Sequence, residues 1–547
     1  PIISKEVKTS RRVMRPKFLA AEMGVFGANV AVAETGTVIT MTNEGNGRMV
    51  GTLPKMHLYI FGIEKFVAKM SDIRYIFKVL PRNGTAQNIT TYLSFYTGAS
   101  SVVSDPENDT KEQKDFHIII LDTPERRKIM ESEDYKDIFC CIRCAACLNV
   151  CPAFRLVGGH VYGGSIYTGG IGTLLTSFLN SRERGKDIQN ICLQCGTCNT
   201  VCGGKLPISN MILKLRTKYA QEDGLNPVHK FCLDTVADRH LFHSMLRIAS
   251  VAQGMITKGQ PMIRHLPMFL SGLTAGRSLP SVAPQPFRDV LPTIKQNVPN
   301  PKGKIAIFTG CLLDFVYVDI ATAVVKALNM AGYTVEMPLG QACCGAPATY
   351  MGDVDNAKKA AIMNIEAMHA EDYDYVVSAC PTCTHALRDY KDMFEDDPEM
   401  YKKAEELCNK TFDFSKLLSM LGGLPDNGDG VPMKVTYHDS CHMKRFMGVY
   451  KEQRELLEGT KGVELIEMNN CDKCCGFGGS YSVKFPEMSA PILEEKIDNV
   501  VASGADVVAV DCPGCLLQIR GGLDARGLNN IQVKHTAQIL VEKRPNQ

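Results

Sequence analysis

Most cysteines of this chain are spaced for binding metal clusters, since all but four of the 22 fall into two patterns that each occur twice. The first pattern is Cys-x2-Cys-x2-Cys-x3-Cys. Its members are Cys141, Cys144, Cys147 and Cys151, and then Cys192, Cys195, Cys198 and Cys202. Three thiolates at this spacing surround one 4Fe–4S cubane, and the fourth usually reaches the second cluster of a two-cluster protein.

We therefore predict two cubane clusters. The ligands of one are Cys141, Cys144, Cys147 and Cys202, and those of the other are Cys192, Cys195, Cys198 and Cys151. Structural zinc is the alternative, but four-thiolate zinc sites use two Cys-x2-Cys pairs, and a run of four cysteines present twice is not their pattern. The spacing thus favours electron transfer.

The second pattern is a single cysteine, a Cys-Cys-Gly doublet and a Cys-Pro-x-Cys motif. Its members are Cys311, Cys343, Cys344, Cys380 and Cys383, and then Cys441, Cys474, Cys475, Cys512 and Cys515. Between single cysteine and doublet lie 31 and 32 residues in the two copies, and between doublet and Cys-Pro-x-Cys lie 35 and 36. Five thiolates exceed the four that a cubane or a zinc ion needs, so this pattern indicates a larger or unusual cluster, or one exchangeable ligand. Buried structural cysteines are the alternative.

The remaining cysteines do not fit these patterns. Cys140 is out of register, and we interpret it as a packing thiol. Cys471 forms a Cys-x2-Cys with Cys474, but no cysteine matches it in the first copy, so we interpret it as incidental. Three histidines lie near the second pattern and could donate hydrogen bonds to sulfur or relay protons, although a polar residue at a strand end is the simpler interpretation. They are His385, His438 and His442.

Composition and charge are those of an ordinary globular protein with three or four domains. The net charge of +2, without a basic stripe, gives no reason to expect nucleic acid. Cysteines at metal spacing favour a reducing compartment, so we expect a cytoplasmic protein. No run of apolar residues is long enough for a membrane span; the most apolar candidate is 262–273. The glycine-rich stretches lack a dinucleotide fingerprint, so we expect neither flavin nor NAD on this chain.

The elements that position the cysteines alternate between strands and helices, which predicts an α/β multidomain protein. In residues 1–129 we expect a strand over 29–42 broken at 34–36, a strand over 56–61, and a loop or linker over 105–114. Residues 130–215 hold the first pattern in helical sequence, and 216–300 form a helical connector. The second pattern lies in an internal repeat, 301–425 and 426–547, where strands are expected at 304–309, 333–337, 375–378, 434–438, 463–467 and 505–510. Doubly wound halves of this kind place ligands at the carboxyl ends of strands.

Three regions resemble known families. Ala33–Gly36, Asn43–Arg48, Leu53–Lys55 and Gly62–Lys65 resemble the second half of the LUD domain of lactate-utilisation proteins, and we expect its first half to be absent. The first cysteine pattern resembles the two-cluster ferredoxin domain of the LutB-type iron–sulfur subunit. The repeat resembles the paired cysteine-rich CCG domains of the LutA type, which also occur in heterodisulfide reductases. The chain is therefore similar to a LutB–LutA fusion with a partial LUD domain.

The resemblance implies an iron–sulfur electron-transfer subunit of a lactate dehydrogenase complex, and hence an oxidoreductase component. Its partners would be an FAD-containing dehydrogenase subunit, further electron-transfer or LUD-type subunits, and a quinone or other acceptor, in the cytoplasm or at the inner membrane face. The resemblance also implies that each CCG domain holds a non-cubane 4Fe–4S cluster on its five cysteines. Two alternatives stay open: a heterodisulfide or thiol–disulfide reductase that works at a five-cysteine cluster, and an iron–sulfur subunit of glycolate or glycerol-3-phosphate dehydrogenase.

Overall fold

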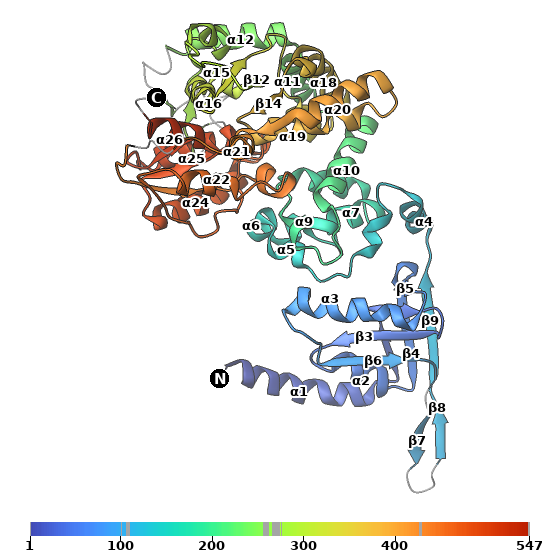
Figure 1. Ribbon diagram of the computed structural model, residues 1–547. Coiled ribbons are helices and arrows are strands. Elements are labelled where there is room, and N and C mark those ends of the chain that lie inside the picture. The colour runs from blue at the N-terminus through green and yellow to red at the C-terminus, as the bar shows by residue number, and fades with distance from the viewer. Residues whose placement is uncertain are drawn as a thin grey trace. The chain divides into compact units, whose positions relative to one another are not determined.

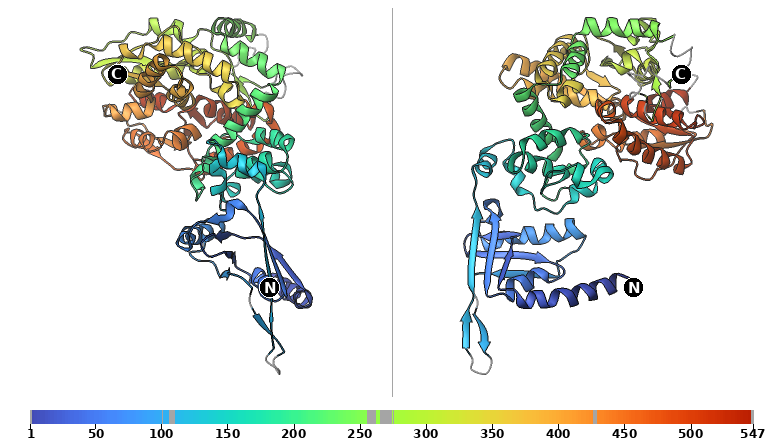
Figure 2. Two further views of the ribbon diagram at one scale, coloured as in Figure 1. Left: turned by 90° about the vertical axis from the view of Figure 1, so that its right-hand side faces the viewer. Right: turned by 180° about the vertical axis from the view of Figure 1, so that it is seen from behind.

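The computed structural model describes residues 2–99, 101–105, 110–254, 262–264, 274, 276–425 and 429–544. It divides into two compact units (Figures 1 and 2). The N-terminal unit comprises 1–151, 163–185 and 198–211, and the C-terminal unit comprises 152–162, 186–197 and 212–547. The first cysteine motif of the first pattern thus lies in the N-terminal unit, the second is divided between the units, and the whole repeat belongs to the C-terminal unit.

The N-terminal unit begins with an α/β segment that contains two main sheets. The parallel sheet has the order β1-β4-β9, and the mixed sheet has the order β5-β2-β3-β6. Helices and strands in this segment are α1 (Ile2–Ala20), β1 (Met23–Phe26), β2 (Val30–Val32), β3 (Thr37–Thr42), α2 (Asn46–Thr52), β4 (Met56–Gly62), β5 (Phe66–Val67), α3 (Ile73–Thr85), β6 (Tyr92–Tyr96) and β9 (Asp115–Leu121). The strand over 29–42 with its break is confirmed as the hairpin β2–β3, and the strand over 56–61 is confirmed as β4.

The predicted loop over 105–114 is wrong for the part of it that the structure describes, residues 105 and 110–114, while 106–109 lie outside the described residues. β7 (Ser101–Asp105) and β8 (Thr110–Gln113) pair as antiparallel strands, and β8 leads into β9. An antiparallel ribbon can satisfy its backbone hydrogen bonds without burying an apolar face, so its charged composition resembles that of a loop.

Short helices carry the first cysteine pattern. They are α4 (Pro124–Glu131), α5 (Ala146–Asn149), α6 (Pro152–Val161), α7 (Gly169–Leu179), α8 (Arg182–Ile188), α9 (Thr197–Val201) and α10 (Ile208–Asp223), with 3-10 turns at Lys136–Cys140 and Gln189–Ile191. The connector follows as α11 (Pro227–Ala237), α12 (Arg239–Ala252), β10 (Met262–Ile263), β11 (Leu279–Pro280) and α14 (Phe287–Val290). Most of the apolar stretch 262–273 lies outside the described residues. None of the described helices is long and apolar enough to cross a membrane.

The two halves of the repeat each form a four-stranded parallel sheet with the first strand inside. Their orders are β13-β12-β14-β15 and β17-β16-β18-β19. The strands are β12 (Gly303–Ile307), β13 (Tyr333–Glu336), β14 (Tyr375–Ser378), β15 (Thr411–Asp413), β16 (Met433–Tyr437), β17 (Val463–Leu465), β18 (Val507–Ala509) and β19 (Gln532–Lys534). Six of these strands are the predicted ones. Strands β15 and β19 were not predicted from the sequence.

Helices cover both sheets of the repeat and complete the α/β architecture. The first half contains α15 (Leu312–Phe315), α16 (Val318–Met330), α17 (Ala346–Met351), α18 (Val354–Met368), α19 (Pro381–Asp389), α20 (Pro398–Lys410) and α21 (Phe414–Met420). The second half contains α22 (Glu452–Glu458), α23 (Tyr481–Lys484), α24 (Pro486–Ser503), α25 (Pro513–Ala525) and α26 (Thr536–Glu542), and a π-helical turn at His442–Phe446. The inner strands β12, β14, β16 and β18 supply fully buried residues to the cores. The predicted α/β multidomain fold is confirmed.

Candidate iron–sulfur sites

A cavity of about 230 Å³ in the N-terminal unit is lined by the four cysteines predicted to hold the first cubane. They are Cys141, Cys144, Cys147 and Cys202. Burial raises the pKa of Cys141 and of Cys147, so binding iron as thiolates would have to offset a real desolvation cost. Cys140, the last residue of a 3-10 turn, is exposed, so its interpretation as a packing thiol is wrong; it also lines this cavity.

The loops between the cysteines have the same unusual backbone in both ferredoxin motifs. Arg143 and Ala145 have φ of 61° and 62°, and the equivalent Gln194 and Gly196 have φ of 58° and 71°. Three of these four are not glycine, so the left-handed conformation costs free energy that the surroundings must offset. In this conformation the backbone of Arg143 hydrogen-bonds Cys141, and the backbone of Gln194 hydrogen-bonds Cys192. Each hydrogen bond lowers the pKa of its thiol, whereas burial raises it. The loops are thus shaped to stabilise thiolates.

The glycine-rich insert between the two motifs allows close approach to a cysteine. Gly170 has φ of 28°, and a Cβ there would lie 2.9 Å from the Sγ of Cys147. A side chain at this position would enter the cysteine cavity. This explains why the start of α7, which is buried throughout Gly169–Thr176, contains so much glycine.

The four predicted ligands of the second cubane are divided between the units. Cys192 and Cys195 belong to the C-terminal unit, and Cys151 and Cys198 belong to the N-terminal unit. Their grouping around one cluster stays a prediction. Within the C-terminal unit, Arg445 donates a hydrogen bond to the Cys195 carbonyl (3.1 Å), so the second ferredoxin motif contacts the second half of the repeat.

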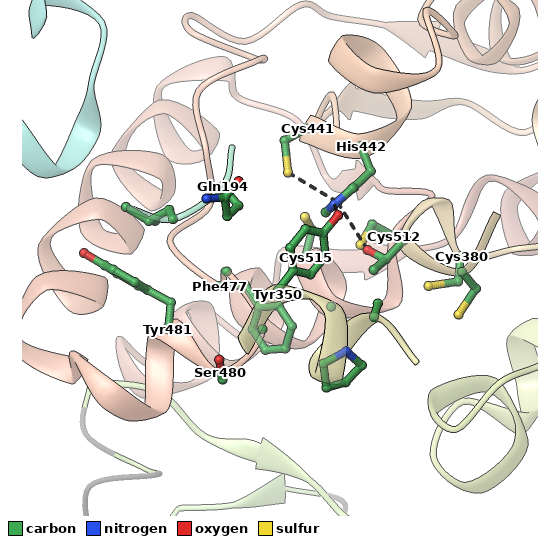
Figure 3. A pocket seen from close by; sticks show the side chains of 18 of the residues that line it. Gln194, Tyr350, Cys380, Cys441, His442, Phe477, Ser480, Tyr481, Cys512 and Cys515 are labelled. Atoms are coloured by element: carbon green, nitrogen blue, oxygen red, sulfur yellow. Dashed lines mark hydrogen bonds between the residues drawn. The ribbon is translucent and has the colours of Figure 1, made fainter. Parts of the chain in front are cut away.

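A single cavity of about 340 Å³ in the C-terminal unit collects the cysteines of both halves of the repeat, together with Cys192 (Figure 3). The repeat cysteines that line it are Cys311, Cys343, Cys344, Cys380, Cys383, Cys441, Cys474, Cys475, Cys512 and Cys515. They follow strand ends, as predicted: Cys311 comes after β12, Cys380 after β14 and Cys512 after β18. All 22 cysteines, each within the described residues, are free of disulfide bonds. This converging set of free thiols fits an iron–sulfur cluster.

These cysteines are positioned by helix N-termini and by turns that contain glycine. Cys380 and Cys512 are the N-caps of α19 and α25, where Pro381 and Pro513 take the first helical positions. A helix N-terminus favours negative charge, and so a thiolate. After the doublets, Gly476 has φ of 86°, and a Cβ there would lie 2.8 Å from the Ser489 carbonyl oxygen.

The second thiol of each doublet is the one that ionises most easily. Hydrogen bonds from Cys343 and Cys383 lower the pKa of Cys344 to about 6, and hydrogen bonds from Cys474 and Cys515 lower that of Cys475 well below its usual value. Neighbouring thiols and burial raise the pKa of Cys383 and of Cys515. The two halves therefore share one electrostatic pattern around their doublets.

The three predicted histidines have different environments. His442 lines the cavity; its Nδ1 lies 3.7 Å from the Cys441 Sγ, and its Nε2 lies 2.6 Å from the Tyr350 hydroxyl (Figure 3). His385 instead pairs with Asp389 at 3.2 Å. His438 lines the cavity and is 1% exposed. His438 and His442 thus lie beside the cysteines of the cavity, where they can interact with sulfur.

Sequence reasoning missed Arg216, which joins the second ferredoxin motif to the repeat. Its guanidinium donates to the carbonyls of Gln189 (2.7 Å), Cys192 (3.1 Å) and Tyr350 (2.8 Å), and to the Gln189 side chain (2.7 Å). Lys496, 1% exposed, was missed as well; its ammonium donates to the Asn470 and Cys471 carbonyls. Neither residue belongs to a motif; Lys496 is marked only by its burial, and the half-buried Arg216 only by its hydrogen bonds.

Comparison with known proteins agrees with these features. Residues 2–121 match the LUD domain, 137–206 the 4Fe-4S dicluster domain, and 305–388 and 435–520 the cysteine-rich domain CCG. Fold and sites together define a multidomain iron–sulfur protein suited to electron transfer.

Relatives name the family. The chain is 41% identical over 240 residues to lactate utilization protein A of Shouchella clausii, a match that covers 44% of this chain and 99% of the relative. It is 39% identical to the Bacillus subtilis protein of that name (43% and 98% covered). It is 30% identical over 436 residues to a probable glycolate oxidase iron-sulfur subunit of Bacillus subtilis (76% and 96% covered). The chain belongs to the iron–sulfur protein family that includes these lactate utilization proteins and the probable glycolate oxidase iron-sulfur subunit.

One solved structure, of a hypothetical protein from Helicobacter pylori, shares 9% identity at a TM-score of 0.36, and the match covers 62% of this chain and 67% of that one. That score is too low to define a common fold.

Proposed function

We propose that this chain is the iron–sulfur electron-transfer subunit of a complex that oxidises a 2-hydroxy acid, with lactate as the favoured substrate. The LUD match and the relatives named for lactate utilisation support lactate, while the relative matched over 436 residues bears the name of glycolate oxidase and keeps glycolate as the second candidate. The hydride chemistry would take place on an FAD-containing partner, and a quinone or another acceptor would receive the electrons, in the cytoplasm or at the inner membrane face.

One observation supports the proposal above the others: a single cavity collects cysteines from the second ferredoxin motif and from both halves of the repeat. When bound, iron–sulfur clusters at these cysteines would supply one-electron transfer at closely spaced sites. The chain itself holds the thiols in place, lowers the pKa of one thiol in each doublet, and excludes water by burying seven of the repeat cysteines.

The number and the ligands of the clusters belong to the same proposal. Two cubanes would lie in the ferredoxin domain (130–215) and one cluster in each CCG domain (301–425 and 426–547), beside the LUD segment (1–129) and the connector (216–300). Anaerobic purification with iron and sulfide analysis and EPR tests this, since four clusters predict about sixteen irons. About eight irons with bound zinc would contradict the clusters of the repeat.

The electron-transfer role has its own test. The iron-containing chain, mixed with a candidate flavoprotein and lactate under anaerobic conditions, is expected to bleach as its clusters are reduced, and to stay oxidised with lactate alone. Reduction of a disulfide by the isolated chain with an artificial electron donor, without any flavoprotein, would instead favour the thiol–disulfide reductase alternative.

A further inference from the structure

The second half of the repeat brings a histidine nitrogen to its cysteines. His438 directly follows β16 and precedes Cys441 by three residues. A ring nitrogen of His438 and the Sγ atoms of Cys475 and Cys515 all lie within 4.8 Å of one another, and all three residues are buried. The histidine also lines the cysteine cavity. Nitrogen and sulfur ligand atoms are therefore gathered at one point.

The hydrogen bonding of His438 decides which nitrogen is free to bind metal. Nδ1 lies 3.1 Å from the carbonyl oxygen of Cys471. A carbonyl oxygen only accepts, so Nδ1 carries the hydrogen, and a neutral imidazole then has its lone pair on Nε2. Nε2 is buried and makes no hydrogen bond of ordinary length and angle with the described residues; its neighbour is the Cys475 thiol, which interacts with the His438 side chain. A buried polar atom without such a hydrogen bond is costly, and a metal ion would satisfy it.

The carbonyl that orients His438 is itself fixed. The Lys496 ammonium donates to the Cys471 oxygen at 3.2 Å, and the backbone N–H of Asp439 donates to the same oxygen at 3.2 Å. Metal-binding histidines commonly donate their other N–H to a fixed carbonyl, which sets the tautomer and the ring orientation. Cys471 therefore matters through its carbonyl, while its thiol points to Asp439 (3.5 Å) and Arg454 (3.7 Å).

The first half of the repeat has the same scaffold but a different residue at each of these positions. Phe308, three residues before Cys311, replaces the histidine and has no ligand atom. Asn364, sixteen residues before Cys380 as Lys496 is before Cys512, replaces the lysine and donates to the Cys343 carbonyl at 2.9 Å. The two halves thus share their cysteines and differ in the buried residues around them.

We propose that the second half of the repeat binds its cluster through the Nε2 atom of His438 in addition to cysteine sulfur, whereas the first half binds its cluster through sulfur alone. This inference rests on the proposed clusters of the repeat.

Nitrogen ligation can be tested spectroscopically on the full chain. We would purify it anaerobically with ¹⁵N only in histidine, reduce it, and record pulsed EPR spectra beside those of protein with ¹⁴N-histidine. One cluster signal is expected to show a nitrogen coupling that changes with the isotope. The coupling should vanish in His438→Phe, which copies Phe308, and persist in His442→Phe. His442 is the matched control because it lines the same cavity but both of its nitrogens already have protein partners.

Each outcome bears on the inference. Identical spectra for the two isotopes in a chain with about sixteen irons, the number that four clusters require, would overturn nitrogen ligation and leave the proposed function intact. A coupling that persists in His438→Phe would overturn the assignment to this residue. Iron and sulfide counts without a cluster in the second half would overturn both proposals. The isotope comparison uses the unaltered chain, so it decides whether a histidine nitrogen binds a cluster even if His438→Phe does not fold.

Discussion

Replacement of Arg216 by methionine is expected to destabilise the C-terminal unit and to disturb the cluster predicted at Cys192. Arg216 makes four hydrogen bonds to two separate segments, at Gln189 and Cys192 in one and at Tyr350 in the other. Burial raises the pKa of Cys192, and the charge of Arg216 opposes this effect. One side chain therefore supports both the fold and the thiolate.

The expected loss in the free energy of unfolding depends on the hydrogen bonds that Arg216→Met removes. Hydrogen bonds from a charged donor contribute about 1.5–3 kcal/mol each, and a buried carbonyl left without a partner costs about 1–3 kcal/mol. The four contributions are not additive, because the three carbonyls are close together and some regain water. We therefore expect a loss of about 3–5 kcal/mol in the free energy of unfolding, below the simple sum of the four hydrogen bonds. Arg216→Lys should recover part of it, since lysine keeps the charge but not the forked geometry.

Anaerobic urea unfolding followed by circular dichroism would measure this loss, and EPR of the reduced protein would report on the cluster at Cys192. The control is Arg526→Met. Arg526 pairs with Asp498 (2.6 Å) and Glu494 (3.8 Å), which are both exposed, and surface pairs contribute at most about 1 kcal/mol. If Arg216→Met loses no more stability than this control and its EPR spectrum is unchanged, the structural role given to Arg216 is wrong.

Two further predictions concern the repeat. Gly476→Ala should cost about 1–3 kcal/mol more than Gly527→Ala in urea unfolding, because both glycines have positive φ but only the first would place its Cβ against a backbone oxygen; equal costs would contradict this. Burial, and then the nearby Asp511, raise the pKa of Asp413 well above its usual value, so the folded state keeps a proton that the unfolded state loses, and wild-type stability falls as pH rises above the unfolded pKa. The stability of Asp413→Asn relative to wild type should therefore increase between about pH 6 and about pH 8, by at most about 1.4 kcal/mol per pH unit, and a difference independent of pH would refute the raised pKa.

Cysteine spacing predicted much of this molecule, because a cluster dictates both the type and the separation of its ligands. The same four cysteines that spacing assigned to the first cubane line one cavity, and both cysteine sets of the repeat line another. Features that depend on tertiary contacts could not be predicted. Gly170 approaches Cys147, and the Nε2 atom of His438 makes no hydrogen bond of ordinary length and angle with the described residues, only because distant segments pack there. The strand pair β7–β8 was missed because its composition is polar.

The cavity shared by the two halves of the repeat has a consequence for how the protein matures. Its walls come from segments near residues 192, 311 and 441, so it closes only after most of the chain has been synthesised. Binding of iron and sulfide is therefore coupled to the folding of these segments around the cavity and supplies free energy for it. Under iron starvation the chain should remain incompletely folded around the cavity and be degraded more easily. Its abundance should therefore fall when the supply of its cofactor falls.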